Sequence, residues 1–299
     1  MAVSNSLAAK PKQKFSVAIQ GDGYKNLINS TLGDPKRAAR FIAAVSSAVA
    51  VNPALQDCDA GTILSAALLG ESLGLSPSPQ LGQYYMVPFS DNKNNRKVAQ
   101  FQLGYKGYIQ LAVRSGQYKK LNVLAIKEGE LVKYNPLEEE IEVNLIEDEE
   151  DRENAETIGY YAMFEYVNGF KKAMYWSKKK MEAHALRYSK GYAAKKGYTF
   201  WEKDFDGMAY KTMLRQLISK WGIMSVDLQT AYEKDTAVIK ESGDAEFVGD
   251  APDEATSQTE TPEPTKVDAP QPETAQQPSQ ETPPASEPAQ QGFDFFAGT

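Results

Sequence analysis

The sequence predicts an α+β domain in which β-hairpins pack on helices. Residues 34–50 and 59–73 carry Ala, Leu, Ile and Val at helical spacing, so each segment is expected to bury one helix face. Residues 91–95 and the pair Asn168-Gly169 are turn sequences between strand-forming runs, and Asn-Gly is the strongest short-range hairpin signal. The resulting order of helix, helix, hairpin, helix, strands, hairpin, helix and helix is typical of α+β proteins.

Capping residues indicate where the helices of the amino-terminal half begin and end. Asp34 and Asp59 are expected N-caps, because their carboxylates can accept hydrogen bonds from free amides of the first helical turn. Gly74 and Gly116 are expected to end helices, because glycine readily adopts the left-handed conformation that follows a helix. The expected elements are helices at residues 34–50 and 59–73, strands at 83–89 and 97–103, and a helix at 105–115.

The carboxyl-terminal half of the body is predicted from the same kinds of signal. Ser177 is the expected N-cap of a lysine-rich helix, and Gly222 is the expected end of a longer helix. The expected strands span residues 121–127, 141–145, 158–167 and 170–176, and the expected helices span residues 178–188, 204–221 and 228–240.

Composition divides the chain into three parts. Residues 1–24 are polar and are expected to be a flexible amino terminus, and residues 25–240 are expected to form the folded body. Nine of the sixteen prolines lie between Pro252 and Pro288, in a segment that cannot bury enough apolar surface to fold. Residues 241–299 are therefore expected to be a disordered, acidic, proline-rich tail with an aromatic tip, Gly-Phe-Asp-Phe-Phe. A solubilising tail, a DNA mimic and a protein-binding tip all remain open as roles for it.

Charge is distributed unevenly along the chain. The formal net charge is −7, yet residues 1–232 carry 30 basic and 25 acidic residues, whereas residues 233–299 carry 3 basic and 15 acidic ones. Within the first part, residues 138–156 hold 11 acids and one arginine. The rest of the body is therefore strongly basic, which favours a polyanionic partner.

One run of the body contains cations and aromatic rings but no acid. Residues 92–127 hold eight lysines and arginines, with Phe101, Tyr105, Tyr108 and Tyr118 among them. Cations can follow a phosphate backbone, and aromatic rings can stack on bases. The run therefore predicts a surface that binds nucleic acid.

Two expected helices place cations on one face. Lys106, Gln110 and Arg114 lie four residues apart in one helix, and Lys211 and Arg215 do so in another. Most such stripes are ordinary solvated faces, which usually interleave carboxylates with the lysines. No carboxylate is interleaved in either of these stripes, so we favour phosphate contacts over a merely solvated face.

Lys-Gly-Tyr occurs three times, at residues 106–108, 190–192 and 196–198. The last two copies lie in the acid-free stretch 188–199, which we interpret as a mobile loop that nucleic acid can order. The candidate nucleic-acid-binding residues are Gln102, Tyr105, Lys106, Gln110, Arg114, Lys119, Lys120, Lys178, Lys190, Lys195, Lys196, Lys211, Arg215 and Lys220.

Other conspicuous side chains have plainer interpretations. Trp201 and Trp221 are expected to be core anchors rather than base-stacking rings, because burial is the usual fate of a large aromatic ring. His184 has no serine or cysteine nucleophile beside it, and we expect a surface imidazole. The acids of residues 138–156 could bind Mg²⁺ as in a nuclease, but they are consecutive and not dispersed over converging strands, so a solvated loop is favoured.

Cofactors and compartment follow from what the sequence lacks. It has no G-x-x-x-x-G-K-[ST] phosphate loop, so no ATP is expected, and Mg²⁺ is expected at most to modulate binding of nucleic acid. One histidine and one cysteine exclude a conventional zinc site, and no catalytic residues are assigned. Cys58 cannot form an internal disulfide, and no apolar stretch is long enough to cross a bilayer, so a cytoplasmic protein is expected.

Three separated blocks carry a more specific signal. Residues 73–88 contain Leu-Gly-Leu-Ser-Pro followed by Leu-Gly-Gln-Tyr-Tyr-Met-Val-Pro, residues 101–117 begin with Phe-Gln-Leu-Gly-Tyr-Lys-Gly-Tyr, and residues 201–215 run from a tryptophan into Met-Ala-Tyr-Lys-Thr-Met-Leu-Arg. These blocks, in this order, resemble the RecT family of phage recombinases. The resemblance covers roughly residues 30–235.

The resemblance implies a single-strand annealing protein with a fold similar to that of the lambda Red beta protein. Such proteins are encoded by a phage or prophage, bind single-stranded DNA, form rings or helical filaments, and pair complementary strands without ATP. The implied partners are single-stranded DNA and its annealed duplex, further copies of the chain, a 5′→3′ exonuclease and a host single-strand-binding protein. On the matching positions, Lys106, Arg114, Lys211 and Arg215 are implied DNA contacts, with Gln102 and Tyr105 beside them.

Two functions of other classes stay open at this point. A protective single-strand-binding protein explains the basic, aromatic surface equally well, and only the three family blocks favour annealing. A metal-dependent nuclease would use the acidic residues 138–156 and is distinguished by Mg²⁺-dependent loss of labelled DNA.

Overall fold

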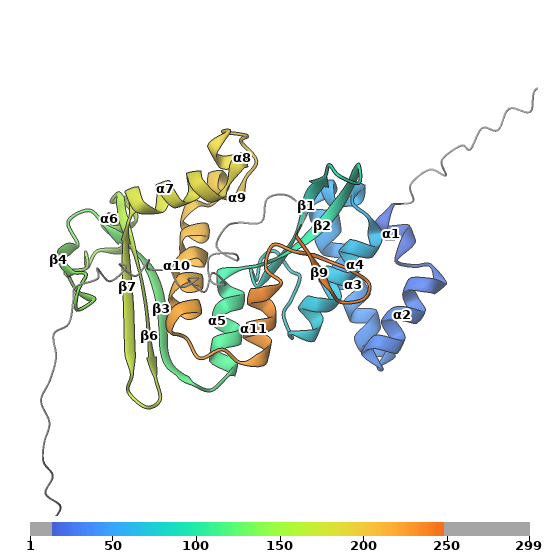
Figure 1. The fold of residues 1–299 in the computed structure, drawn as a ribbon, viewed down its shortest axis with the longest axis horizontal. Helices are drawn as coiled ribbons and strands as arrows, with labels where there is room; N and C mark the ends of the chain where they lie inside the picture. The colour runs from blue at the N-terminus through green and yellow to red at the C-terminus, as the bar shows by residue number, and fades with distance from the viewer. Residues whose placement is uncertain (1–13, 248–299) are drawn as a thin grey trace, which may run out of the picture. The chain divides into compact units, whose positions relative to one another are not determined.

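The computed structural model describes residues 14–247 (Figure 1). Helices and antiparallel β-sheets both contribute, as the predicted α+β class requires. None of the helices in residues 14–247 has the length and apolar character that crossing a membrane requires. The predictions for residues 1–13 and for the acidic tail beyond residue 247 lie outside the described residues.

The first described elements form a helical layer. It comprises α1 (Phe15–Ala18), α2 (Asp22–Leu32), α3 (Pro35–Val51), the 3₁₀ turn η1 (Pro53–Asp57) and α4 (Ala60–Ser72). The two expected helices are confirmed, and Asp34 and Asp59 cap them by accepting from the amides of Lys36 and Gly61. The expectation that the chain is loose up to residue 24 is wrong from Phe15 onwards, because the side chain of Phe15 is buried in the core.

The first hairpin and the helix after it pack on this layer. β1 (Tyr84–Asp91) and β2 (Arg96–Leu103) pair antiparallel along their whole length, and α5 (Tyr105–Arg114) follows directly. Tyr84, Phe101 and Tyr108 are fully buried and belong to the same hydrophobic core as apolar residues of α3 and α4. The hairpin predicted from the turn at residues 91–95 is thus confirmed.

A second sheet has its own core. Its strand order is β3 (Tyr118–Lys127), β6 (Thr157–Tyr166) and β7 (Lys171–Ser177), all antiparallel. Packed on it are α7 (Lys178–Tyr188) and α10 (Phe205–Trp221), and the short helices α8 (Lys190–Ala193) and α9 (Phe200–Lys203) lie between those two in sequence. The stretch 188–199, expected as a loop, therefore contains the helical turn α8.

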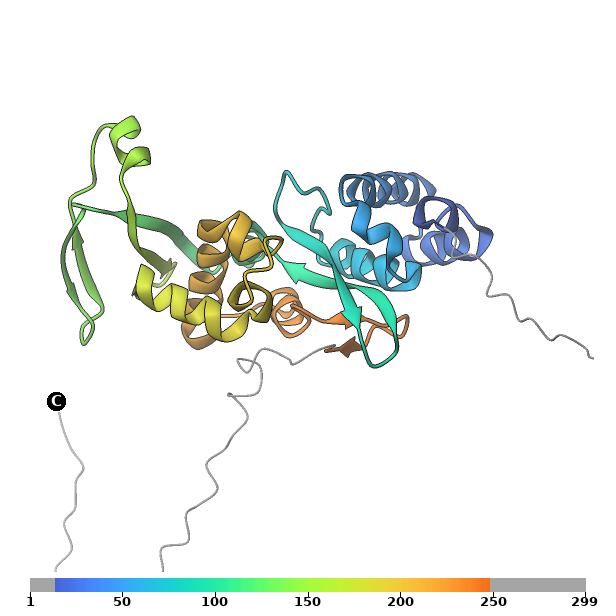
Figure 2. The ribbon, with the colours of Figure 1, turned by 90° about the horizontal axis from the view of Figure 1, so that it is seen from above.

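α10 connects the two cores. Leu214 and Ile218 belong to the core of the helical layer, whereas Met213 and Leu217 belong to the core of the second sheet. In both ribbon views α10 lies between α5 and the β3–β6–β7 sheet (Figures 1 and 2). The side chains on α10 are therefore enclosed from two directions, which matters for the cations that it carries.

The last described elements are short. α11 is Val226–Glu233, and β8 (Val238–Ile239) pairs with β9 (Ala245–Glu246). The expected helix at residues 228–240 is therefore right at its start and wrong at its end. Thr236 has a positive φ of 69°, and the amide of Phe101 donates to the carbonyl oxygen of Ala237, so this segment runs beside β2 instead of continuing the helix.

The acidic segment is more ordered than the expected loop. β4 (Leu131–Asn135) pairs with β5 (Glu140–Val143), and α6 (Glu149–Asn154) follows. Within residues 14–247, no group of three His, Cys, Asp or Glu side chains is placed to hold a metal ion. The acids here cap and flank short elements, as Asp148 does by accepting from the amide of Asp151.

Glu130, directly before β4, is a fully buried carboxylate. It accepts hydrogen bonds from the guanidinium of Arg152 at 2.6 Å and from the amides of Lys127 and Ile146. Burial alone raises the pKa of Glu130, but these donors outweigh burial and hold the pKa below its usual value.

We expect Glu130→Gln to lower the free energy of unfolding by about 1.5–3 kcal/mol at pH 7, the usual worth of a charge-assisted hydrogen bond. Because the folded-state pKa is depressed, this contribution is present above about pH 4.3 and is lost as the pH falls through the folded-state pKa. Urea unfolding of both proteins at pH 7 and at about pH 3 measures it. A difference that stays constant over this range would rule out the ionised carboxylate as its source.

Candidate nucleic-acid interface

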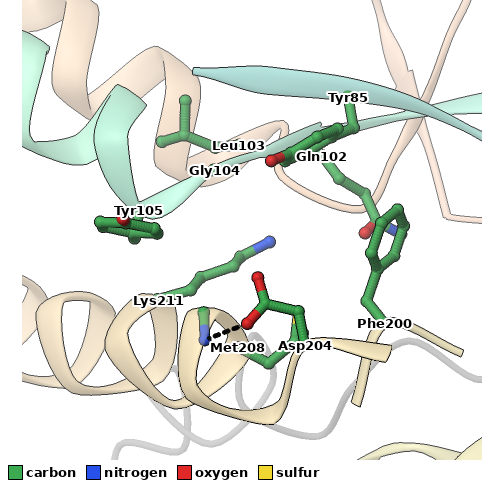
Figure 3. A pocket seen from close by; sticks show the side chains of 10 residues that line it. Tyr85, Gln102, Leu103, Gly104, Tyr105, Phe200, Asp204, Met208 and Lys211 are labelled. Atoms are coloured by element: carbon green, nitrogen blue, oxygen red, sulfur yellow. Dashed lines mark hydrogen bonds between the residues drawn. The ribbon is translucent and has the colours of Figure 1, made fainter. Parts of the chain in front are cut away.

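A pocket lies where the first hairpin faces the start of α10 (Figure 3). Residues from β1, β2, α5, α9 and α10 line it, and they come from two distant parts of the sequence, residues 85–105 and 200–211. The lining residues are Tyr85, Gln102, Leu103, Gly104, Tyr105, Phe200, Asp204, Gly207, Met208 and Lys211. Three of them, Gln102, Tyr105 and Lys211, were predicted from the sequence as candidates.

Glycines allow the backbone on the hairpin side to approach closely. A Cβ built on Gly104 would lie 2.1 Å from the carbonyl oxygen of Gly82, a distance that no side chain tolerates. Gly82 itself has a φ of +60°, and a Cβ there would meet the Tyr85 hydroxyl and the Lys106 side chain. The close approach therefore leaves room beside Gly82 for Tyr85, which lines the pocket, and for Lys106.

Aromatic rings form much of the wall. The Tyr85 and Phe200 ring centroids are 5.4 Å apart, and Tyr105 meets Tyr210 edge to face at 5.6 Å. Figure 3 shows the Tyr85 ring, the Tyr105 ring and the Phe200 ring around one open space. Phe200 keeps 39% of its surface exposed, so a large apolar face remains for a ligand.

Polar groups lie between these rings. Asp204 is the N-cap of α10, accepting from the amide of Gly207 at 2.9 Å, and Figure 3 shows its carboxylate directed at the space. Burial, and secondly the negative charge of Asp204, raise the pKa of Tyr85. Gln102 is half-buried, and its side-chain amide has no hydrogen-bond partner within residues 14–247.

An exposed cationic face continues from the pocket along α5. Lys106 and Gln110 are exposed, as the four-residue spacing predicts, and Lys106 has no ion-pair partner among the described residues. Arg114 is exposed but docked, since its guanidinium donates to the carbonyl oxygen of Leu73 at 2.9 Å and lies against Gly74. This face offers positive charge that no carboxylate of residues 14–247 neutralises.

A second group of cations precedes Phe200 in the chain. Lys190 begins α8, and the exposed side chains of Lys195 and Lys196 follow it. Lys195 and Lys196 have no ion-pair partner in the part of the chain that the structure describes. This segment leads directly into α9, whose Phe200 lines the pocket, so its cations lie on the chain that borders the pocket.

Lys211 and Arg215 form a buried ion cluster with Asp235. They do not form an exposed stripe. Their nitrogens are 3.0 and 2.9 Å from the two oxygens of Asp235, and only 12% of each cationic side chain is exposed, against 1% of the acid. Asp235 also accepts from the amide of Leu103, and Arg215 donates to the Tyr108 hydroxyl. The sequence predicted an exposed face with phosphate contacts at Lys211 and Arg215, but α10 packs against α5 and Asp235 approaches this face, so both cations are buried.

Three further candidate cations each lie beside a carboxylate. Lys119 and Lys120 lie 2.7 and 3.9 Å from the buried carboxylate of Glu165. Lys178 lies 2.9 Å from Glu156. None of these three lines the pocket, so the structure does not bring them together with the residues of α5.

The two tryptophans differ from each other. Trp201 is 7% exposed and belongs to the second core, which confirms its predicted role as an anchor. Trp221 is 40% exposed at the end of α10, so its predicted burial is wrong. The ammonium groups of Lys172 and Lys220 lie 4.1 and 5.1 Å from its ring centroid, and such cation–π contacts occupy the ring instead.

His184 is not the surface imidazole that the sequence indicated. It lies among the rings of Trp176, Tyr188 and Trp201, with centroids 4.6 to 6.3 Å away. Burial, and then the positive charge of Arg187 and other cations, lowers the pKa of His184 to about 4. The imidazole is therefore neutral at physiological pH and serves as part of an aromatic cluster.

Sequence reasoning missed Tyr85, Phe200 and Asp204 as pocket residues. Asp204 was expected at the start of its helix, but capping gives no indication of what its second oxygen faces. Tyr85 and Phe200 are 115 positions apart, and their ring contact depends on the docking of the hairpin against α9. The alternation of burial along β1 does show that Tyr85 lies on the opposite face from the buried Tyr84.

Comparison with known proteins gives a consistent answer. The model of the RecT family matches residues 39–248. The chain is 41% identical over 238 residues to "Uncharacterized protein YqaK" of Bacillus subtilis (strain 168), covering 77% of each chain. It is 31% identical over 221 residues to "Protein RecT" of Escherichia coli (strain K12), covering 73% of this chain and 78% of that protein. The protein therefore belongs to the RecT family, a family of DNA recombination and annealing proteins.

Proposed function

We propose that this protein anneals complementary single strands of DNA without ATP during homologous recombination. Membership of the RecT family is the observation that carries the proposal. The exposed cations of α5 and of residues 190–196 support it, because phosphate contacts supply most of the affinity for a single strand. The aromatic rings beside these cations support it further, since base stacking does not depend on sequence.

In the proposed mechanism, the protein holds one strand by its backbone, and base pairing alone reads its sequence. Lys106, Lys195 and Lys196 contact phosphates, which position a strand without reading its sequence. The base edges of the held strand stay open to a second strand, and Watson–Crick pairing selects the partner. The free energy of pairing drives the reaction, so no nucleotide hydrolysis is needed.

We propose that several copies act together and that other proteins supply the strands. Self-association aligns the held backbone from one subunit to the next, so pairing can extend along a continuous template. A 5′→3′ exonuclease is the expected source of single strands, and a host single-strand-binding protein is a further expected partner.

The binding part of this proposal is tested by fluorescence anisotropy of labelled oligonucleotides of several sequences over a salt series. We expect every sequence to bind, with an affinity that falls linearly with salt on a double-logarithmic plot. An affinity that ignores salt would contradict a phosphate-based interface. Mg²⁺-dependent loss of the labelled strand would instead support the nuclease.

A further inference from the structure

We propose that the pocket between the first hairpin and the start of α10 takes a single nucleobase turned out of the bound strand, with guanine preferred. The inference rests on the proposed single-strand binding and deepens it by assigning one nucleotide of each bound segment to a defined site. It follows from three properties of the pocket: its rings, its polar groups and its position beside unpaired cations.

The rings offer faces for a planar ligand. Tyr85, Tyr105 and Phe200 surround the open space and come from three different elements (Figure 3). Tyr85 and Tyr105 are half-buried, and Phe200 is exposed on one side, so none of the three is closed off within the core. A base is a flat π-system, and stacking on such rings is the usual way in which proteins hold an unpaired base.

The polar groups suit the edge of guanine. The Asp204 carboxylate can only accept hydrogen bonds, and guanine presents two adjacent N–H donors on its Watson–Crick edge. The side chain of Lys211, whose ammonium group also donates to Asp235, and the unpartnered amide of Gln102 line the same space, and both carry donors of the kind that the neighbouring carbonyl of guanine accepts. Thymine, cytosine and adenine each present only part of this pattern.

The geometry of Asp204 is fixed by the backbone. One of its oxygens accepts from the Gly207 amide, and a Cβ on Gly207 would come within 2.2 Å of the other. The Gly207 amide therefore holds the carboxylate at the pocket, and the absence of a side chain at position 207 leaves room for it. The cap itself satisfies only part of the hydrogen-bonding capacity of a carboxylate, so acceptor sites remain for a ligand.

The position of the pocket connects the base to the backbone. Lys106 shares the surroundings of Gly82 with Tyr85, and residues 195–196 precede Phe200 by a few positions. A strand whose phosphates contact these lysines passes the mouth of the pocket. A base turned into it interrupts the stack of the strand at each subunit and leaves the intervening bases available for pairing.

The test uses the full chain and free deoxynucleoside monophosphates, observed by saturation-transfer NMR. We expect dGMP to bind most tightly, with saturation reaching its base protons more than its sugar protons. Asp204→Asn keeps a good helix cap and should weaken dGMP by about tenfold, because it removes a charged acceptor from the base edge. Phe200→Ala should weaken all four nucleotides by about five- to tenfold through lost stacking.

Phe247→Ala is the matched control, because Phe247 is exposed to a similar degree, 41%, and lies outside the pocket. It should leave nucleotide binding unchanged. Equal binding of all four nucleotides that Asp204→Asn does not alter would overturn the proposal, as would transfer confined to the sugar protons. Oligonucleotide binding by the same protein distinguishes failure of the pocket proposal from failure of the proposed function. If the protein binds strands but no nucleotide, only the pocket proposal fails. If it binds neither, the proposed function fails as well.

Discussion

Replacing Lys106, Lys195 and Lys196 together by alanine should lower the affinity for single-stranded DNA roughly 50-fold near 0.15 M salt. Each phosphate contact contributes about 0.7 to the slope of log affinity against log salt for single strands, so the variant should lose about 2 from that slope. All three side chains are exposed and have no ion-pair partner within residues 14–247, so their removal should cost little stability. Anisotropy titrations of one labelled oligonucleotide over a salt series measure both quantities.

A matched triple variant distinguishes local contacts from net charge. Arg37, Lys97 and Lys240 are also on the surface, but each is paired with a carboxylate. Their replacement by alanine removes the same formal charge and should change the slope far less. Equal slopes of log affinity against log salt in the two triple variants would mean that the strand binds elsewhere on the protein.

Asp235→Ala should lower the free energy of unfolding by about 3–5 kcal/mol. The substitution leaves Lys211 and Arg215 as enclosed cations without their carboxylate, and removing one partner of a buried ion pair has a cost of this size. It also leaves the amide of Leu103 without its acceptor. Urea unfolding monitored by circular dichroism gives the difference.

Asp57→Ala is the comparison for this effect. Asp57 pairs with Lys97 at 2.9 Å, but both side chains are more than half exposed, and pairs of that kind contribute at most about 1 kcal/mol. Similar losses for the two variants would mean that the cluster around Asp235 is hydrated, and that Lys211 and Arg215 are free to serve as the DNA contacts implied by the family resemblance.

Local signals predicted the elements well for a physical reason. The carboxylates of Asp34 and Asp59 and the hydroxyl of Ser177 satisfy free amides within three residues, so their effect does not depend on the rest of the fold. The Asn168-Gly169 turn is similarly self-contained, with Gly169 at a φ of +87°. Such caps and turns form regardless of what packs against them.

The candidate site could be predicted only in part, because exposure depends on what packs against an element. Four-residue spacing put Lys106 and Gln110 on one face of α5 and Lys211 and Arg215 on one face of α10, yet only the first face is open. The difference arises from Asp235, which approaches α10 after α11 has reversed the chain. Helical periodicity describes a face and does not show what covers it.

The most direct test of the account is a fluorescence-quench assay that mixes two complementary labelled strands with the protein, without ATP, over a salt series. We predict pairing far faster than the spontaneous rate, with an acceleration that weakens as salt rises and is largely lost in the Lys106, Lys195 and Lys196 triple variant. Tight binding of both strands with no acceleration, or with slower pairing, would contradict annealing and would identify a protective single-strand-binding protein with this fold.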